Sequence, residues 1–122
     1  TGFRMVTLMN SPGNSSRDPL ADAGLAHFFE QRFTVDPVKR FKPSPVTYDQ
    51  VTDTLSVSPD QCLLVAAHLW DTIGAQAMGW KAALVTRGMN ATIPIDGVPQ
   101  PDLVVNDMTE LSHQLIERFA GR

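Results

Sequence analysis

Several classes of protein are disfavoured by what the sequence lacks. It has no apolar run near the roughly 18 residues that a membrane-spanning helix needs. Its formal net charge of −3 gives no reason to expect binding to nucleic acid or to an acidic membrane. No charged segment followed by an apolar one indicates a secretion signal. No pair of histidines has metal-ligand spacing, so we expect no metal and no cofactor.

Cysteine is nearly absent as well. The single cysteine, Cys62, cannot form an internal disulfide, and its apolar neighbours predict a buried, inert thiol. A chain of this kind suits a reducing compartment, and we expect a cytoplasmic protein. With 122 residues, 43% hydrophobic, the chain is expected to form one domain with one core. It begins at Thr1 rather than Met and soon enters an apolar run, which we interpret as a cut rather than a natural start.

Short apolar runs alternate with helical patterns along the chain. The segments predicted as strands are 3–9, 62–67, 82–86 and 103–105, together with the more polar 31–35. The segments predicted as helices are 18–27, 46–55, 69–78 and a last one that opens at Asp107 with Glu110 as a capping box. This alternation indicates βαβ units and a mostly parallel sheet with helices on both faces. The predicted fold class is therefore α/β, a three-layer Rossmann-like core with residues 1–122 as one domain.

Polar residues follow the predicted strands. In parallel sheets, ligands bind beyond the carboxyl ends of the strands. Asn10 follows the first strand, Lys42 lies in the loop after the second, and Asp71 follows the third. We therefore expect Asn10, Lys42 and Asp71 to converge on one edge. Arg87 follows the fourth strand.

Plainer interpretations of the same residues stay open. A lysine beside an aspartate is often only a surface ion pair, which contributes little to stability. Asp71 begins a helix, where a carboxylate is favoured simply as a cap. The basic cluster Lys39-Arg40-Phe41-Lys42 could be a solvated loop. Against this, Phe41 and Pro43 flank Lys42 and restrict its backbone, which favours a functional lysine.

Three segments, in order and with compatible spacing, cover nearly the whole chain. They are Val6-Thr7-Leu8-Met9-Asn10, Asp36-Pro37-Val38-Lys39-Arg40-Phe41-Lys42-Pro43, and His68-Leu69-Trp70-Asp71-Thr72-Ile73-Gly74-Ala75. Together they resemble the haloacid dehalogenase superfamily, and most closely its L-2-haloacid dehalogenase branch. The Lys-Pro and Trp-Asp-x-x-Gly-Ala blocks are fairly specific, and three matches in order are stronger than any one of them.

The resemblance implies a mechanism and a role for each candidate residue. The family hydrolyses short 2-haloalkanoic acids through an ester formed by an aspartate nucleophile on the first strand. Lys42 would hold and polarise that nucleophile, and Asp71 would orient Lys42 and help to place water. Asn10 would bind substrate or halide, and Trp70 would wall the site off from solvent. His68, where asparagine is common, is either a substitute polar group that binds substrate or a helix cap.

The chain also departs from the family pattern. Met9 stands where the family usually has Ser or Thr, and Ala66 stands where dehalogenases often have serine, so hydroxyl donors are lost. Related phosphatases hold magnesium through acids spaced four residues apart. Here Ala67 occupies the position four residues before Asp71, and hard cations need several oxygen ligands. The resemblance therefore implies metal-independent dehalogenation, with a phosphatase-type relative as the alternative.

The largest departure is the first motif. The family's nucleophile segment and helical cap domain would precede Thr1, so we expect an incomplete core that lacks both and is inactive alone. The missing strand would lie between the strands at Val6 and Val65, leaving two edges unpaired. We expect marginal folding, repair by a missing amino-terminal segment, or a dimer completed by a second copy. A non-catalytic interaction domain on the same fold is the other alternative.

Overall fold

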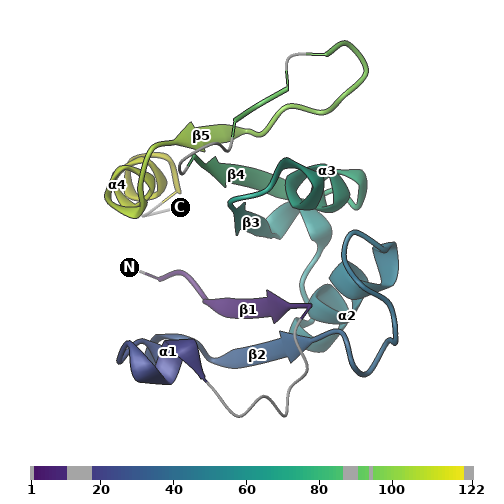
Figure 1. Cartoon of the computed structure of the whole chain (residues 1–122). Coiled ribbons are helices and arrows are strands. Elements are labelled where there is room, and N and C mark those ends of the chain that lie inside the picture. Colours follow the sequence, from purple (N-terminus) through teal and green to yellow (C-terminus); the bar gives the residue numbers. More distant parts are fainter. Residues whose placement is uncertain (1, 11–17, 87–90, 94, 120–122) are drawn as a thin grey trace.

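The computed structural model describes residues 2–10, 18–86, 91–93 and 95–119 (Figure 1). The strands are β1 (Val6–Met9), β2 (Gln31–Thr34), β3 (Leu63–Ala66), β4 (Lys81–Val85) and β5 (Leu103–Val105). The helices are α1 (Pro19–Asp22), α2 (Pro45–Leu55), α3 (Leu69–Ala77) and α4 (Met108–Phe119), with short 3-10 turns at Ala26–Phe28 and Pro59–Gln61. The α/β class is confirmed, and all five predicted strands are present in the predicted order.

The strands form two parallel sheets, one of β1 and β2 and the other of β3, β4 and β5. Figure 1 shows β1 and β3 as the strands of the two sheets that face each other. Within the described residues each of them is hydrogen-bonded along one edge only. The Thr7 hydroxyl of β1 is buried without a partner among these residues, and Val65 of β3 is 39% exposed. The free edges of β1 and β3 are thus the two unpaired edges that the resemblance predicts.

Two apolar clusters hold the fold together. One joins β2, α2, β3 and α3, and its buried members are Phe33, Tyr48, Val51, Leu64, Ala75 and Trp80. The other joins β4, β5 and α4, and its buried members are Ala83, Val85, Leu103, Val105 and Leu111. Because alternate residues of a strand point to opposite faces, the second cluster uses one face of the β3–β4–β5 sheet and leaves the other to α3. This is the predicted layered arrangement.

Two local predictions are wrong. The helix predicted at 18–27 ends at Asp22, because Gly24 adopts a left-handed φ of +72° that stops an α-helix. The thiol of Cys62 is half-buried rather than buried, since it lies at the edge of the first cluster just before β3. Burial and the nearby Asp60 carboxylate still raise the pKa of Cys62.

The last helix begins as predicted. Asp107 Oδ1 accepts a hydrogen bond of 2.8 Å from the Glu110 N–H. The Glu110 carboxylate in turn accepts from the Asn106 N–H, one residue earlier than a capping box requires. None of the helices in the described part of the chain has the length and apolar character to cross a membrane.

Candidate active site

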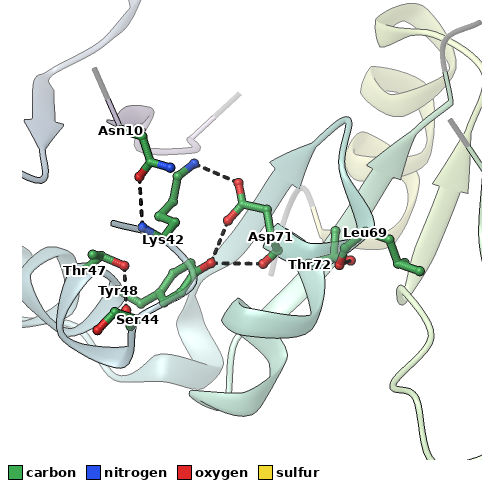
Figure 2. A network of polar contacts seen from close by, with 8 residues as sticks. All are labelled: Asn10, Lys42, Ser44, Thr47, Tyr48, Leu69, Asp71 and Thr72. Carbon is green, nitrogen blue, oxygen red and sulfur yellow. Dashed lines mark hydrogen bonds and ion pairs between the residues drawn. The ribbon is translucent and has the colours of Figure 1, made fainter. Parts of the chain in front are cut away.

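The residues that follow β1, β2 and β3 meet at one place, as the sequence predicts. The Lys42 backbone N–H donates a 2.9 Å hydrogen bond to Asn10 Oδ1. The Lys42 ammonium lies 2.7 Å from Asp71 Oδ2. Figure 2 shows the three side chains drawn together from separate segments. The structure thus links both sheets through Asn10, Lys42 and Asp71.

The ion pair is shielded from solvent. The side chain of Lys42 is 11% exposed and that of Asp71 is 7% exposed. Two charges buried to this degree are costly unless each is paired and hydrogen-bonded. The interpretation of the pair as an ordinary surface salt bridge is therefore wrong. The carboxylate of Asp71 also turns toward Lys42 rather than serving as a helix cap.

Tyr48 completes the network from the first turns of α2. Its hydroxyl donates a 2.6 Å hydrogen bond to Asp71 Oδ1 and lies 3.2 Å from the Asp71 carbonyl oxygen (Figure 2). The ring is fully buried and packs edge-on against Trp80, with ring centroids 5.5 Å apart. Burial first, and then the hydrogen bond and charge of Asp71, raise the pKa of Tyr48 well above its usual range. The phenol therefore stays protonated and remains a donor to Asp71.

Gly74 lets α3 approach this network closely. A Cβ at position 74 would lie 2.6 Å from Pro43 Cβ and 2.6 Å from the Tyr48 hydroxyl oxygen. Neither neighbour is the far end of a flexible side chain, since one atom belongs to a proline ring and the other to a buried phenol. The Gly in the Trp-Asp-x-x-Gly-Ala block thus has a packing reason to be glycine. It keeps Asp71, one turn earlier on α3, within reach of Lys42 and Tyr48.

Trp70 and His68 lie at the more open side of the site. The Lys42 ammonium is 5.9 Å from the Trp70 ring centroid, within the range of a cation–π contact. Trp70 is 43% exposed, so it covers the ion pair only in part. His68 is exposed and its ring is stacked 5.7 Å from that of Trp70. Although His68 occupies the N-cap position of α3, its side chain makes no capping hydrogen bond.

The donor set does not fit a magnesium site. Both carboxylate oxygens of Asp71 are engaged, one by Lys42 and the other by Tyr48. Ala67, four residues earlier, offers no oxygen from its side chain. Among the described residues no cluster of three or more His, Cys, Asp or Glu could hold a metal. A hard cation needs several oxygen ligands, and these residues supply too few.

Sequence reasoning missed Tyr48 as part of the site. The helical spacing predicts α2 but does not reveal that the Tyr48 phenol contacts Asp71 on α3, which lies 23 positions later in the chain. The available signal was that a buried tyrosine needs a hydrogen-bond partner, and this is the only tyrosine of the sequence. Arg87, the polar residue expected after β4, lies outside the described residues.

Comparison with known proteins identifies the family. Residues 40–111 match the family model described as HAD-hydrolase-like, and this stretch holds Lys42, Tyr48 and Asp71. The chain belongs to the haloacid dehalogenase-like (HAD) hydrolases.

The curated relatives of this HAD chain include dehalogenases and phosphatases. It is 30% identical to (S)-2-haloacid dehalogenase 2 of Pseudomonas sp. (strain CBS-3), over 97% of this chain and 51% of that protein. It is 29% identical to the phosphoglycolate phosphatase of Vibrio cholerae, over 90% of this chain and 48% of that protein. The chain thus spans about half the length of these relatives.

A solved structure shares the arrangement. The L-2-haloacid dehalogenase from Xanthobacter autotrophicus, with chloropropionic acid covalently bound, superposes with a TM-score of 0.70 at 28% identity. The match covers 83% of this chain and 49% of that one. The fold of this HAD chain is therefore that of a dehalogenase core over the part the two share.

Proposed function

We propose that residues 1–122 form the carboxyl-terminal portion of the core domain of a 2-haloacid dehalogenase-type hydrolase. The reaction would remove halide from short 2-haloalkanoic acids. The observation that carries the proposal is the buried Lys42–Asp71 pair, which lies where β1, β2 and β3 end and beside the unpaired edges of β1 and β3. A strand supplied between those edges would bring a carboxylate to the Lys42 ammonium.

The chemistry follows from that placement. The supplied carboxylate attacks C2 of the haloacid, a C–O bond forms, and the C–halogen bond breaks with its electron pair leaving on halide. Water then adds to the ester carbonyl, which frees the carboxylate and a 2-hydroxy acid. Lys42 keeps the nucleophile ionised because a nearby cation lowers the pKa of a carboxylic acid. Asp71, fixed by Tyr48, holds the ammonium in position and helps to orient the water.

The remaining candidates have simpler roles in this proposal. The Asn10 Oδ1 atom is occupied by the Lys42 N–H, so its amide N–H groups are the donors left for substrate or halide. Trp70 would cover one side of the bound haloacid. His68 would supply a polar contact in place of asparagine, since it is not used as a helix cap.

Dehalogenation is favoured over phosphoryl transfer by two observations. A dehalogenase of the same fold has been solved with chloropropionic acid covalently bound, which supports dehalogenation. The engaged Asp71 oxygens and the alanine at 67 leave no pair of free carboxylates for magnesium. We therefore propose that the protein belongs to a metal-independent hydrolase.

A second candidate, a non-catalytic interaction domain, rests on the same unpaired edges. Unpaired strand edges are templates for another strand, and a second copy of the chain could supply it. In that case the protein would form a stable dimer and would gain no activity when an amino-terminal piece is added.

Complementation separates these possibilities. The chain is mixed with the amino-terminal half of (S)-2-haloacid dehalogenase 2 of Pseudomonas sp. (strain CBS-3), and halide release from 2-chloropropionate is measured. We expect halide release from the mixture and none from either piece alone. Magnesium-dependent phosphate release from phosphoglycolate, without halide release, would favour the phosphatase alternative. A stable homodimer that ignores the added piece would favour the interaction domain.

A further inference from the structure

A second cleft adjoins the site on the β1–β2 side. It has a volume of about 420 Å³ and is lined by Asn10, Val35, Asp36, Lys39, Arg40 and Phe41. Asn10 belongs to both places, because its Oδ1 atom also accepts the Lys42 N–H. A ligand in this cleft could therefore reach the proposed reaction centre through Asn10.

The cleft is positively charged although the protein is acidic overall. Lys39 and Arg40 line it, and neither forms an ion pair within the part of the chain that the structure describes. Asp36 also lines it and is engaged in an interaction of its own. The described residues of the lining thus carry one more positive charge than negative, in a protein of net charge −3. Such a local excess favours an anionic ligand.

The backbone of the turn restrains the two residues that carry these cations. The turn closes through hydrogen bonds from the Val38 and Lys39 N–H groups to the Val35 carbonyl. Lys39 has a left-handed φ of +52°, a conformation that costs a residue other than glycine on the order of 1 kcal/mol. The Arg40 guanidinium donates a 2.9 Å hydrogen bond to the Lys39 carbonyl oxygen, which restrains the Arg40 side chain against the turn.

The apolar lining narrows the class of ligand. Val35 is buried, and Phe41 is 68% exposed at the edge of the cleft. These side chains suit the methylene groups of a carbon skeleton, while the two cations suit a carboxylate at its end. A simple inorganic anion would use only the cations.

We propose that Lys39 and Arg40 bind a second, distal carboxylate of the substrate. The substrate class would then be 2-haloacids with two carboxylates, such as 2-chlorosuccinate, preferred over 2-chloropropionate. The proposal rests on the proposed function for the reaction and on the cleft alone for anion binding. These two parts can be tested separately.

The binding part uses the 122-residue chain. Succinate and acetate are titrated into it, and backbone amide shifts at 36–41 are followed by NMR. We expect saturable shifts with succinate, weaker by about tenfold in Lys39→Gln/Arg40→Gln. The matched control is Lys81→Gln/Arg118→Gln, which removes the same charge from positions outside the cleft and should bind like the parent. The charge-preserving variant Lys39→Arg/Arg40→Lys should also bind.

Three results would contradict carboxylate binding by Lys39 and Arg40. One is that Lys39→Gln/Arg40→Gln and the parent bind succinate equally well. A second is loss of succinate binding in the control variant Lys81→Gln/Arg118→Gln, because binding would then depend on the net charge of the protein rather than on the cleft. A third is a phosphate or chloride titration that matches succinate in every variant, because the apolar lining would then play no part.

The turnover part uses the protein complemented with the amino-terminal half. We expect Lys39→Gln/Arg40→Gln to raise KM for 2-chlorosuccinate about tenfold while kcat and the turnover of 2-chloropropionate stay unchanged. An equal loss on both substrates would contradict the assignment of a distal carboxylate. If neither substrate releases halide but succinate still binds through Lys39 and Arg40, the proposed reaction fails and the anion cleft stands.

Discussion

Two ion pairs in this protein have nearly the same distance between nitrogen and oxygen but differ in how far their side chains are exposed to solvent. Lys42 and Asp71 approach to 2.7 Å with side chains 11% and 7% exposed. Arg4 and Glu30 approach to 2.6 Å with side chains 54% and 41% exposed. Exposed pairs contribute little because water and salt screen them. A buried pair is costly to break, since the surviving charge has no solvent to stabilise it.

The difference also lies in what holds each pair. Asp71 is bonded by Tyr48 as well as by Lys42, and the backbone of Lys42 is tied to Asn10. Among the described residues, the Arg4 guanidinium reaches the Glu30 carboxylate and, at 3.4 Å, the Leu55 carbonyl, and no others. A short distance alone therefore does not identify a functional pair. Burial and independent partners from separate segments do.

The largest expected effect is in Lys42→Met. Removing the ammonium leaves the Asp71 carboxylate buried and unpaired, so the free energy of unfolding should fall by about 3–5 kcal/mol. Urea unfolding followed by circular dichroism measures this. The matched variant Arg4→Met should leave the midpoint nearly unchanged. If both substitutions have the same small effect, the contrast between the two pairs is wrong.

Next in size is Gly74→Ala. The added methyl would overlap Pro43 Cβ and the Tyr48 hydroxyl, so we expect a loss of about 3 kcal/mol of unfolding free energy. Adding Tyr48→Phe removes one of the two clashing atoms, and the double variant should lose less than the sum of the single ones. If the losses of unfolding free energy in the two single variants add up to the loss in the double variant, a side chain at position 74 does not clash with the Tyr48 hydroxyl.

Tyr48→Phe alone should cost less, about 1.5 kcal/mol, because it removes one hydrogen bond to a charged group and keeps the ring. The ring contact with Trp80 should survive, which near-ultraviolet circular dichroism reports. Tyr48 stabilises the fold as a protonated phenol, so its contribution is present below pH 10 and is lost as pH rises further. Wild type should thus lose stability above pH 10 more steeply than the phenylalanine variant. If the stability of both proteins falls equally with pH, the Tyr48 hydroxyl is not the source of the loss above pH 10.

The smallest effect belongs to the exposed pair. Its hydrogen bond to Arg4 lowers the pKa of Glu30 from the usual 4.5. The stabilisation is therefore present above pH 4.5 and is lost as pH falls below it. Both groups are exposed, so the change in the urea midpoint between wild type and Arg4→Met should be barely measurable and should vanish in high salt. A salt-resistant difference would mean that this pair is buried in solution.

The meeting of Lys42 and Asp71 could be predicted because both follow predicted parallel strands, whose carboxyl ends meet at one edge of a sheet. The continuous apolar run 62–67 also located β3, but such a run is typical of a strand buried on both faces, and Val65 is 39% exposed beside the unpaired edge. Sequence reasoning failed for α1, where the left-handed backbone of Gly24 is not visible in a helical pattern. It failed for Tyr48, whose role depends on a contact between two helices rather than on spacing within one. The cytoplasmic location and a dimer stay predictions.

The central claim is that the buried pair serves a nucleophile supplied from outside these 122 residues. The most direct test is halide release from 2-chloropropionate by the complemented protein, with Lys42→Ala compared with wild type and with Arg4→Ala. We predict that Lys42→Ala lowers the rate at least about 100-fold, while Arg4→Ala leaves it unchanged. Halide release that survives Lys42→Ala at the wild-type rate would contradict the account.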